Sequence, residues 1–102
     1  MPKEAIIRKH FKELCDRKEI PFWIAPRVRY LKECDIFGVF DALIVRNNQI
    51  VPIQYTTLHN IRARERKVKS FLERARVSIY GEVWGWDDKD KAFLIIPVYS
   101  DN

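Results

Sequence analysis

Asp41 and Gln54 are the two polar residues whose positions in the sequence point most clearly to chemistry. Residues 36–46 and 49–57 are apolar, β-branched runs, and only the Asn-Asn pair at 47–48 separates them. Asparagine tolerates the left-handed backbone that a two-residue hairpin turn requires. With the turn at 47–48, paired positions sum to 95, which places Asp41 opposite Gln54. Because a carboxylate facing a carboxamide between apolar strands is costly unless something uses it, we interpret the pair as a metal-binding site.

A third polar residue belongs with this pair. Side chains alternate between the two faces of a strand, so Thr56 shares a face with Gln54 and Asp41. We therefore expect three polar side chains on one face of the hairpin, close to the end of its second strand.

Two segments have the spacing of amphipathic helices, and they must flank this hairpin. Residues 3–18 place Ile7, Phe11, Leu14 and Cys15 on one face, and Pro21 follows them. The second helix is predicted over residues 61–76, with Asn60 as its cap. Its buried stripe is predicted to consist of Ile61, Val68, Phe71, Leu72 and Ala75.

The remaining apolar runs are typical of strands. Residues 22–30 are rich in aromatic and β-branched residues, and Pro26 suggests an edge or a bulge. Two further strands are predicted over 77–86 and 92–99, joined by a polar turn at 87–91. The order α-β-β-β-α-β plus one extra C-terminal strand predicts an α/β fold, with residues 1–102 as a single domain.

Composition restricts the class of protein. Apolar residues make up 47% of the chain, enough for a packed core, and no apolar run approaches the length of a membrane span. The N-terminal segment lacks the apolar block of a signal peptide, and the two cysteines, Cys15 and Cys34, have no metal-binding or redox spacing. We therefore expect a cytoplasmic protein with reduced thiols and no membrane partner.

The net charge of +5 is spread unevenly. Residues 62–76 carry seven Lys and Arg against two Asp and Glu, whereas residues 77–102 carry two against five. Such asymmetry suits a polyanionic partner such as DNA. Charge alone fits solvated helix faces equally well.

Four short motifs occur in a consistent order along the chain. They are Asp35-Ile36-Phe37-Gly38-Val39-Phe40-Asp41, then Gln54-Tyr55-Thr56, then Asn60 with Arg64 and Lys67, then Trp84-Gly85-Trp86. Together with the order of elements, they resemble the PD-(D/E)xK nuclease superfamily, most closely its small phage- and virus-type members. The likeness covers most of residues 5–86.

The resemblance implies a fold, an activity and a cofactor. The fold would be a mixed central sheet with helices on both faces. The activity would be hydrolysis of DNA phosphodiester bonds with Mg²⁺ or Mn²⁺, which polarises the scissile phosphate and readies a water. Because Mg²⁺ is a hard ion that prefers oxygen ligands, the metal would be held by Asp41, Gln54 and Asp35.

This chain departs from the superfamily pattern at two positions. Gln54 stands where glutamate or aspartate is usual, and Thr56 stands where the catalytic lysine is usual. The two cations of the third motif are the candidates to replace that lysine. On a helical wheel Arg64 falls inside the apolar stripe and Lys67 at its edge, so an inward arginine needs a partner.

The candidate residues can now be grouped by role. The catalytic set is Asp41, Gln54, Thr56, Arg64 and Lys67. The predicted contacts to nucleic acid are Arg27, Arg29, Arg62, Arg64 and Lys67. Glu4 and Glu13 on the first helix are further candidate ligands, although surface glutamates are common.

Two other functions remain open. A catalytically degenerate protein that keeps the fold and binds DNA would also explain Gln54 and the absent lysine. A viral module that binds another protein would need no DNA contact. Within the enzyme class, nothing in the sequence separates a junction resolvase from a general endonuclease.

The size of the domain bears on its oligomeric state. A domain this small contacts little DNA alone, so we expect a homodimer formed through the apolar edge at 92–99.

Overall fold

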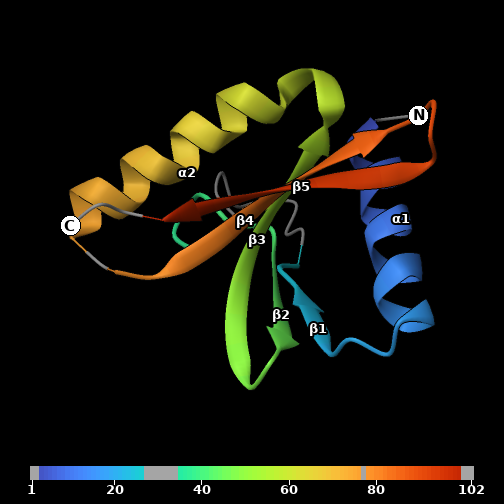
Figure 1. Cartoon of the computed structure of the whole chain (residues 1–102), viewed down its shortest axis with the longest axis horizontal. Coiled ribbons are helices and arrows are strands. Elements are labelled where there is room, and N and C mark those ends of the chain that lie inside the picture. Colours follow the sequence, from blue (N-terminus) through green and yellow to red (C-terminus); the bar gives the residue numbers. More distant parts are fainter. Residues whose placement is uncertain (1–2, 27–34, 77, 100–102) are drawn as a thin grey trace.

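The computed structural model describes residues 3–26, 35–76 and 78–99. Within them, two helices flank one five-stranded sheet whose strands lie in the order β1-β2-β3-β4-β5 (Figure 1). The elements are α1 (Lys3–Arg17), β1 (Phe22–Ile24), β2 (Ala42–Arg46), β3 (Gln49–Thr57), the 3₁₀ turn η1 (Leu58–Asn60), α2 (Ile61–Ala75), β4 (Tyr80–Asp87) and β5 (Ala92–Tyr99). The predicted α/β class and the extra C-terminal strand are confirmed.

The sheet is mixed because one of its pairings is parallel. Strand β2 pairs antiparallel with both β1 and β3, and β4 pairs antiparallel with β5, whereas β3 and β4 run parallel. Parallel neighbours need a crossover connection, since a short turn can join only antiparallel strands. The crossover here consists of η1 and α2, so the end of β3 leads directly into the start of α2.

Strand alternation divides the core into two layers, one for each helix. On one face, α1 packs Ile7, Phe11 and Cys15 against side chains that include Tyr55 and Trp84. On the other face, α2 packs against a second set of side chains, and neighbouring positions along β4 fall into different layers. The buried members of the second layer are Val39, Phe40, Ile61, Val68, Leu72, Val83 and Val98.

A glycine lets α2 begin directly above the sheet. A Cβ at Gly85 would lie 2.6 Å from Cδ1 of Ile61, closer than a real Cβ contact allows. Ile61 is the first residue of α2, so the absence of a side chain at Gly85 brings the start of this helix onto β4. The glycine of the Trp-Gly-Trp motif therefore has a packing role.

Several element boundaries differ from the predictions. The strand predicted over 36–46 begins only at Ala42, because Phe37 and Gly38 adopt positive φ of 56° and 69° and reverse the chain. An antiparallel bridge between Ile36 and Phe40 closes this turn. Strand β4 begins at Tyr80 instead of residue 77.

The other corrections concern β1 and α2. Strand β1 ends at Ile24, well before residue 30, and residues 27–30 lie outside the described part of the chain. Asn60 occupies the cap position of α2 without a capping hydrogen bond from its side chain. Ala75, predicted in the buried stripe, is exposed, because α2 ends there and Arg76 turns into the left-handed region.

The C-terminal strand forms an edge of the sheet, as predicted. Strand β5 pairs only with β4 in the described sheet, and Leu94, Ile95 and Tyr99 are exposed along it.

Neither described helix is long and apolar enough to cross a membrane. Cys15 is a free thiol on the buried face of α1, and burial, with Asp16 nearby, raises its pKa to about 11.

Candidate functional site

The hairpin between β2 and β3 places Asp41 beside Gln54. Asn47 and Asn48 form its turn with φ of 54° and 63°, the left-handed values that a tight hairpin turn of this kind requires. Ala42 pairs with Ile53 in the register, so the predicted sum of 95 is confirmed. Nε2 of Gln54 donates a hydrogen bond of 2.9 Å to Oδ2 of Asp41.

The amide of Gln54 is only half satisfied. Both Asp41 and Gln54 are 4% exposed, and Oδ2 of Asp41 also accepts the backbone N–H of Tyr55 at 3.0 Å. Oε1 of Gln54 is buried and has no hydrogen-bond partner in the described structure. A buried acceptor without a partner costs about 1–3 kcal/mol, so it marks a place where a donor or a cation would be favourable.

These two side chains open onto a pocket of about 310 Å³. Its walls come from the start of α1, the end of β3, the start of α2 and the segment before β2. The pocket is lined by Glu4, Ile7, Asp35, Asp41, Gln54, Tyr55, Thr56, Thr57, Asn60 and Arg64. Four separate segments of the chain thus bring together the five predicted residues Asp35, Asp41, Gln54, Thr56 and Arg64.

Arg64 supplies the positive charge of this pocket. It lies one turn into α2 and is half-buried, whereas the helical wheel placed it inside the apolar stripe. Among the described residues, no carboxylate lies within ion-pairing distance of its guanidinium. The salt bridge to Asp41 or Asp35 that would make Arg64 purely structural is therefore not formed, and its charge is available to an anion that enters the pocket.

Other predicted residues lie elsewhere. Lys67 is exposed one turn further along α2 and does not line the pocket. Arg62 is exposed and pairs with Glu65 at 2.9 Å. Arg27 and Arg29 lie outside the described residues. Of the two first-helix acids, Glu4 lines the pocket, whereas Glu13 lies beside Lys9 and His10, at 4.0 Å from each.

Sequence reasoning missed a second buried polar cluster, which is centred on Glu82. Glu82 is 2% exposed in the middle of β4 and accepts hydrogen bonds from Nη1 and Nη2 of Arg46, from Tyr80 Oη at 2.5 Å and from Trp84 Nε1 at 2.9 Å. The signal available was the alternation Tyr80, Glu82, Trp84, which puts three polar-tipped side chains on one strand face.

The electrostatics of this second cluster are those of a satisfied structural carboxylate. Burial alone would raise the pKa of Glu82, but hydrogen bonds from Arg46, Tyr80 and Trp84 outweigh it and hold the pKa below its usual range. Both carboxylate oxygens have donors, so nothing at Glu82 calls for a ligand.

The donor set around Asp41 suits a hard cation. Carboxylate oxygens of Asp41 and Asp35 and the amide oxygen of Gln54 are the ligand types that Mg²⁺ prefers. No group of three His, Cys, Asp or Glu side chains positioned for a metal occurs within residues 3–26, 35–76 and 78–99. A cation in this pocket would therefore depend on the oxygen of Gln54, the atom that the fold leaves without a partner.

Comparisons of the chain with protein-family models, with curated proteins and with solved structures found no match.

Proposed function

We propose that the pocket around Asp41 and Gln54 is the active site of a metal-dependent DNA endonuclease. The observation that carries this proposal is the buried, unpartnered Oε1 of Gln54 beside the carboxylate of Asp41. Natural proteins rarely leave such an atom unsatisfied without using it. A carboxylate and an unpartnered amide oxygen, next to a half-buried arginine that can hold a phosphate, suit metal-dependent phosphodiester hydrolysis.

Each lining residue has a distinct part in this proposal. Asp41 and Gln54 would hold Mg²⁺ or Mn²⁺, with Asp35 as a further oxygen donor. The ion would supply polarisation of the scissile phosphate and an activated water. Arg64 binds a phosphate oxygen of the substrate, and the hydroxyl of Thr56 can position the water.

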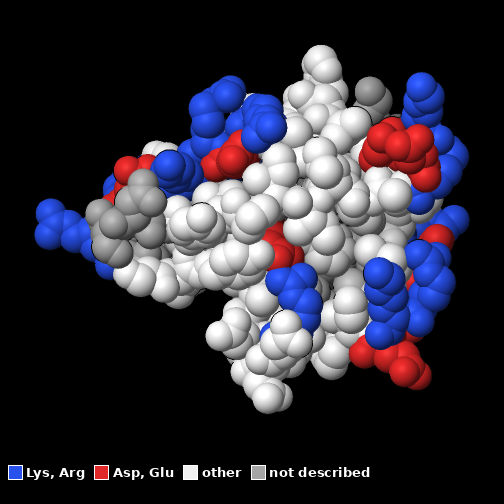
Figure 2. Space-filling view, in the orientation of Figure 1, with Lys and Arg blue, Asp and Glu red and all other residues white. Residues whose placement is uncertain are grey.

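The charge distribution supports a nucleic-acid substrate. Figure 2 shows Lys and Arg side chains gathered over α2 and along α1, with the sheet between them largely free of charge. Helix α2 leads from the pocket outward, and most of its charged residues are basic. A phosphate backbone that enters at Arg64 would therefore meet further cations along the same helix.

The deciding experiment is cleavage of supercoiled plasmid and of a four-way DNA junction in Mg²⁺, Mn²⁺ or EDTA. We expect metal-dependent cutting that falls by at least about 100-fold in both variants, because Asp41→Asn removes the carboxylate charge of the site and Gln54→Leu removes its amide oxygen. Asp88→Asn, a change at an exposed carboxylate in the turn after β4, is the matched control and should cut normally. Equal cutting by Asp41→Asn and the wild-type protein would disprove the proposed site.

A second candidate function is DNA binding without hydrolysis. It is favoured by Thr56, which is 7% exposed at the position where the resemblance to PD-(D/E)xK nucleases expects a lysine. A protein of this kind would shift both DNAs on a gel with equal affinity in Mg²⁺ and EDTA, and would cut neither. A protein that neither cuts nor shifts DNA would be an interaction module, and both DNA proposals would be wrong.

The proposed enzyme would act inside the cell as a homodimer that pairs through the edge strand β5. Leu94, Ile95 and Tyr99 are exposed along this edge, and an uncovered apolar strand is a ready surface for a second copy. Sedimentation of the wild-type protein and of Leu94→Lys tests this arrangement, because a charge on the edge should leave only the monomer.

A further inference from the structure

Phe37 is an exposed aromatic ring held in an unfavourable backbone conformation. Its side chain is 73% exposed and its φ is 56°, a left-handed value that large residues seldom adopt. Hydrogen bonds on both sides fix the turn, from Gly38 N to Asp35 O at 3.0 Å and from Phe40 N to Ile36 O at 2.9 Å. Strain that presents a large apolar ring to solvent is characteristic of a functional position.

Among the described residues, the ring of Phe37 has one aromatic neighbour. Its centroid lies 5.6 Å from that of Phe71 on α2, with the planes inclined by 25°. Phe71 in turn contacts Phe40 edge to face at 5.9 Å. The two inner rings are partly or fully buried, so Phe37 ends a short stack of aromatic rings and offers its outer face to a further planar group.

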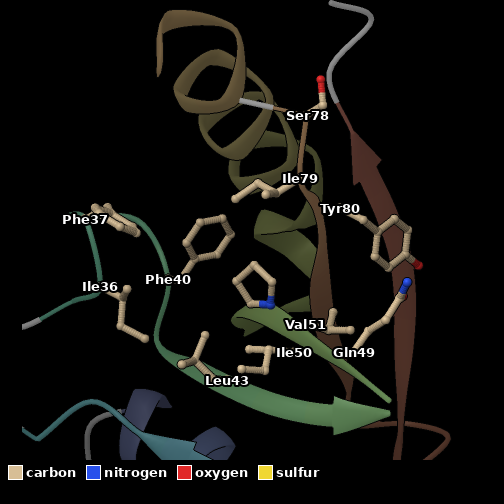
Figure 3. Close-up of a pocket in the computed structure, with 11 residues that line it drawn as sticks. Ile36, Phe37, Phe40, Leu43, Gln49, Ile50, Val51, Ser78, Ile79 and Tyr80 are labelled. Carbon is tan, nitrogen blue, oxygen red and sulfur yellow. The ribbon is translucent and has the colours of Figure 1, made fainter. Parts of the chain in front are cut away.

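A neutral pocket of about 530 Å³ adjoins this ring. Figure 3 shows Phe37 at one rim and Phe40 further in, while Gln49 and Tyr80 lie on the opposite side. No charged side chain is among the described residues that line it. Apolar walls with a few polar groups at one end suit a flat heterocycle that has hydrogen-bonding edges.

Basic side chains flank the aromatic stack along α2. Lys67 lies one turn before Phe71 and Arg74 nearly one turn after it, and residues at these spacings are neighbours on a helix surface. Both are exposed. Phe71 lies seven residues beyond Arg64, or about 10 Å along the helix axis at 1.5 Å per residue. That distance corresponds to about two or three phosphates of a DNA strand.

We infer that Phe37 stacks on an unpaired base of a DNA strand whose backbone follows α2 from Arg64 past Lys67 to Arg74, with the edge of that base over the neutral pocket. This inference deepens the proposed nuclease function, on which it rests, by naming the substrate class. The substrate is DNA with an unpaired nucleotide two or three positions from the cut. Aromatic stacking combined with backbone cations is how proteins hold unpaired bases.

The test uses two DNAs that carry the fluorescent base 2-aminopurine, one in a fully paired duplex and one opposite a gap. Affinities are measured by titration in EDTA, where no cutting occurs. We expect Phe37→Leu to bind the gapped DNA about 5- to 150-fold more weakly than the wild type, and the paired duplex equally well. Phe37→Trp, which keeps an aromatic face at the same backbone conformation, should retain the affinity and the quenching of the fluorescent base.

Three results would overturn the inference. The first is equal binding of the gapped DNA by Phe37→Leu and wild type. The second is an equal loss for the gapped and the paired DNA, which would assign Phe37 to the fold or to duplex contact. The third is a change of sedimentation in Phe37→Leu without any change in base quenching, which would place a second protein copy on this surface.

The outcome is separable from that of the nuclease proposal. If cutting disappears in Asp41→Asn while Phe37→Leu binds the gapped DNA as well as the wild type does, the nuclease proposal is supported and the base contact is rejected. If binding of the gapped DNA requires an aromatic ring at position 37 but the protein cuts no DNA, the base contact is supported and the nuclease proposal is rejected. Lys67→Gln and Arg74→Gln should each lower the salt dependence of binding by about one counterion for both DNAs.

Discussion

Two polar clusters are buried in the same sheet, on opposite faces, and they differ in how completely they are satisfied. Glu82 receives donors at both oxygens from Arg46, Tyr80 and Trp84. In the cluster of Asp41 and Gln54, the amide oxygen has no partner among the described residues. Both clusters contain a carboxylate at most 4% exposed, so burial alone does not separate them.

The difference teaches how to tell a structural carboxylate from a candidate ligand site. A satisfied network contributes to stability and loses it when any member is removed. A cluster with an unused acceptor lowers the stability of the empty protein and regains it when a ligand binds. Mutations should therefore distinguish the two clusters: a change at Glu82 should mainly lower the stability of the fold, and a change at Gln54 should mainly alter ligand binding.

The largest expected effect is at Glu82. Glu82→Ala leaves Arg46 and the indole N–H of Trp84 without their buried acceptor, and we expect a loss of about 3 kcal/mol in the free energy of unfolding, measured in urea. The milder change Tyr80→Phe removes one donor of several and should cost about 1 kcal/mol. A Glu82→Ala protein as stable as the wild type would mean that the satisfied cluster has no structural role.

The next effect is at the contact that holds α2 above the candidate pocket. Gly85→Ala places a Cβ against Ile61, so we expect a loss of about 2 kcal/mol from overpacking, with a weakened start of α2. Because Ile61→Val removes the Cδ1 atom, the double variant should recover part of this loss, and a double-mutant cycle in urea measures the coupling. Additive losses would contradict the steric explanation.

A smaller effect on stability is expected at Gln54 itself. Gln54→Glu replaces a donor to Asp41 with a second carboxylate, so the variant should lose about 1 kcal/mol in EDTA. The same change adds a charged oxygen ligand, and its melting temperature should rise more in Mn²⁺ than that of the wild type does. Gln49→Glu, at the exposed start of β3, is the control and should show no gain from the metal.

The smallest expected effect is the pH dependence of the satisfied cluster. The folded-state pKa of Glu82 lies below the ordinary glutamate value of about 4.3, so its contribution is present above that pH and is lost as pH falls through the folded-state pKa. The urea midpoint should therefore fall below about pH 4 in the wild type more than in Glu82→Gln. We expect less loss than in Glu82→Ala, because a protonated carboxyl group still accepts hydrogen bonds. Parallel pH profiles for the wild type and Glu82→Gln would exclude a role of the charge.

Patterns within short segments predicted much of this molecule. The Asn-Asn turn specified the hairpin register, and with it the contact between Asp41 and Gln54, because a two-residue turn leaves one way to pair the strands. The helical spacing around Arg64 predicted an inward side chain, and the structure has it half-buried in the wall of the pocket, whereas Lys67, predicted at the edge of the stripe, is exposed.

Three features were not predicted, either because local backbone conformation decides them or because they depend on contacts between distant segments. The turn at Phe37 and Gly38 interrupts a run that alternation alone assigns to a strand, since left-handed backbone at a phenylalanine has no sequence signal. The partnership of Glu82 with Arg46 spans 36 residues and depends on which strands become neighbours. Asn60 matched a capping pattern, but the 3₁₀ turn before α2 leaves its side chain without a capping bond.

The tight hairpin also has a consequence for the order in which the molecule assembles. Asp41 and Gln54 are 13 residues apart and belong to one antiparallel unit, which can form in microseconds without the rest of the chain. Arg64 follows Gln54 closely in the chain, but α2 packs against side chains of β4, so this helix is fixed on the sheet only after β4 has paired parallel to β3, a slower step with a larger loop-closure cost. We therefore expect the proposed metal ligands to meet early in folding, and Arg64, the proposed phosphate-binding residue, to be fixed beside them last.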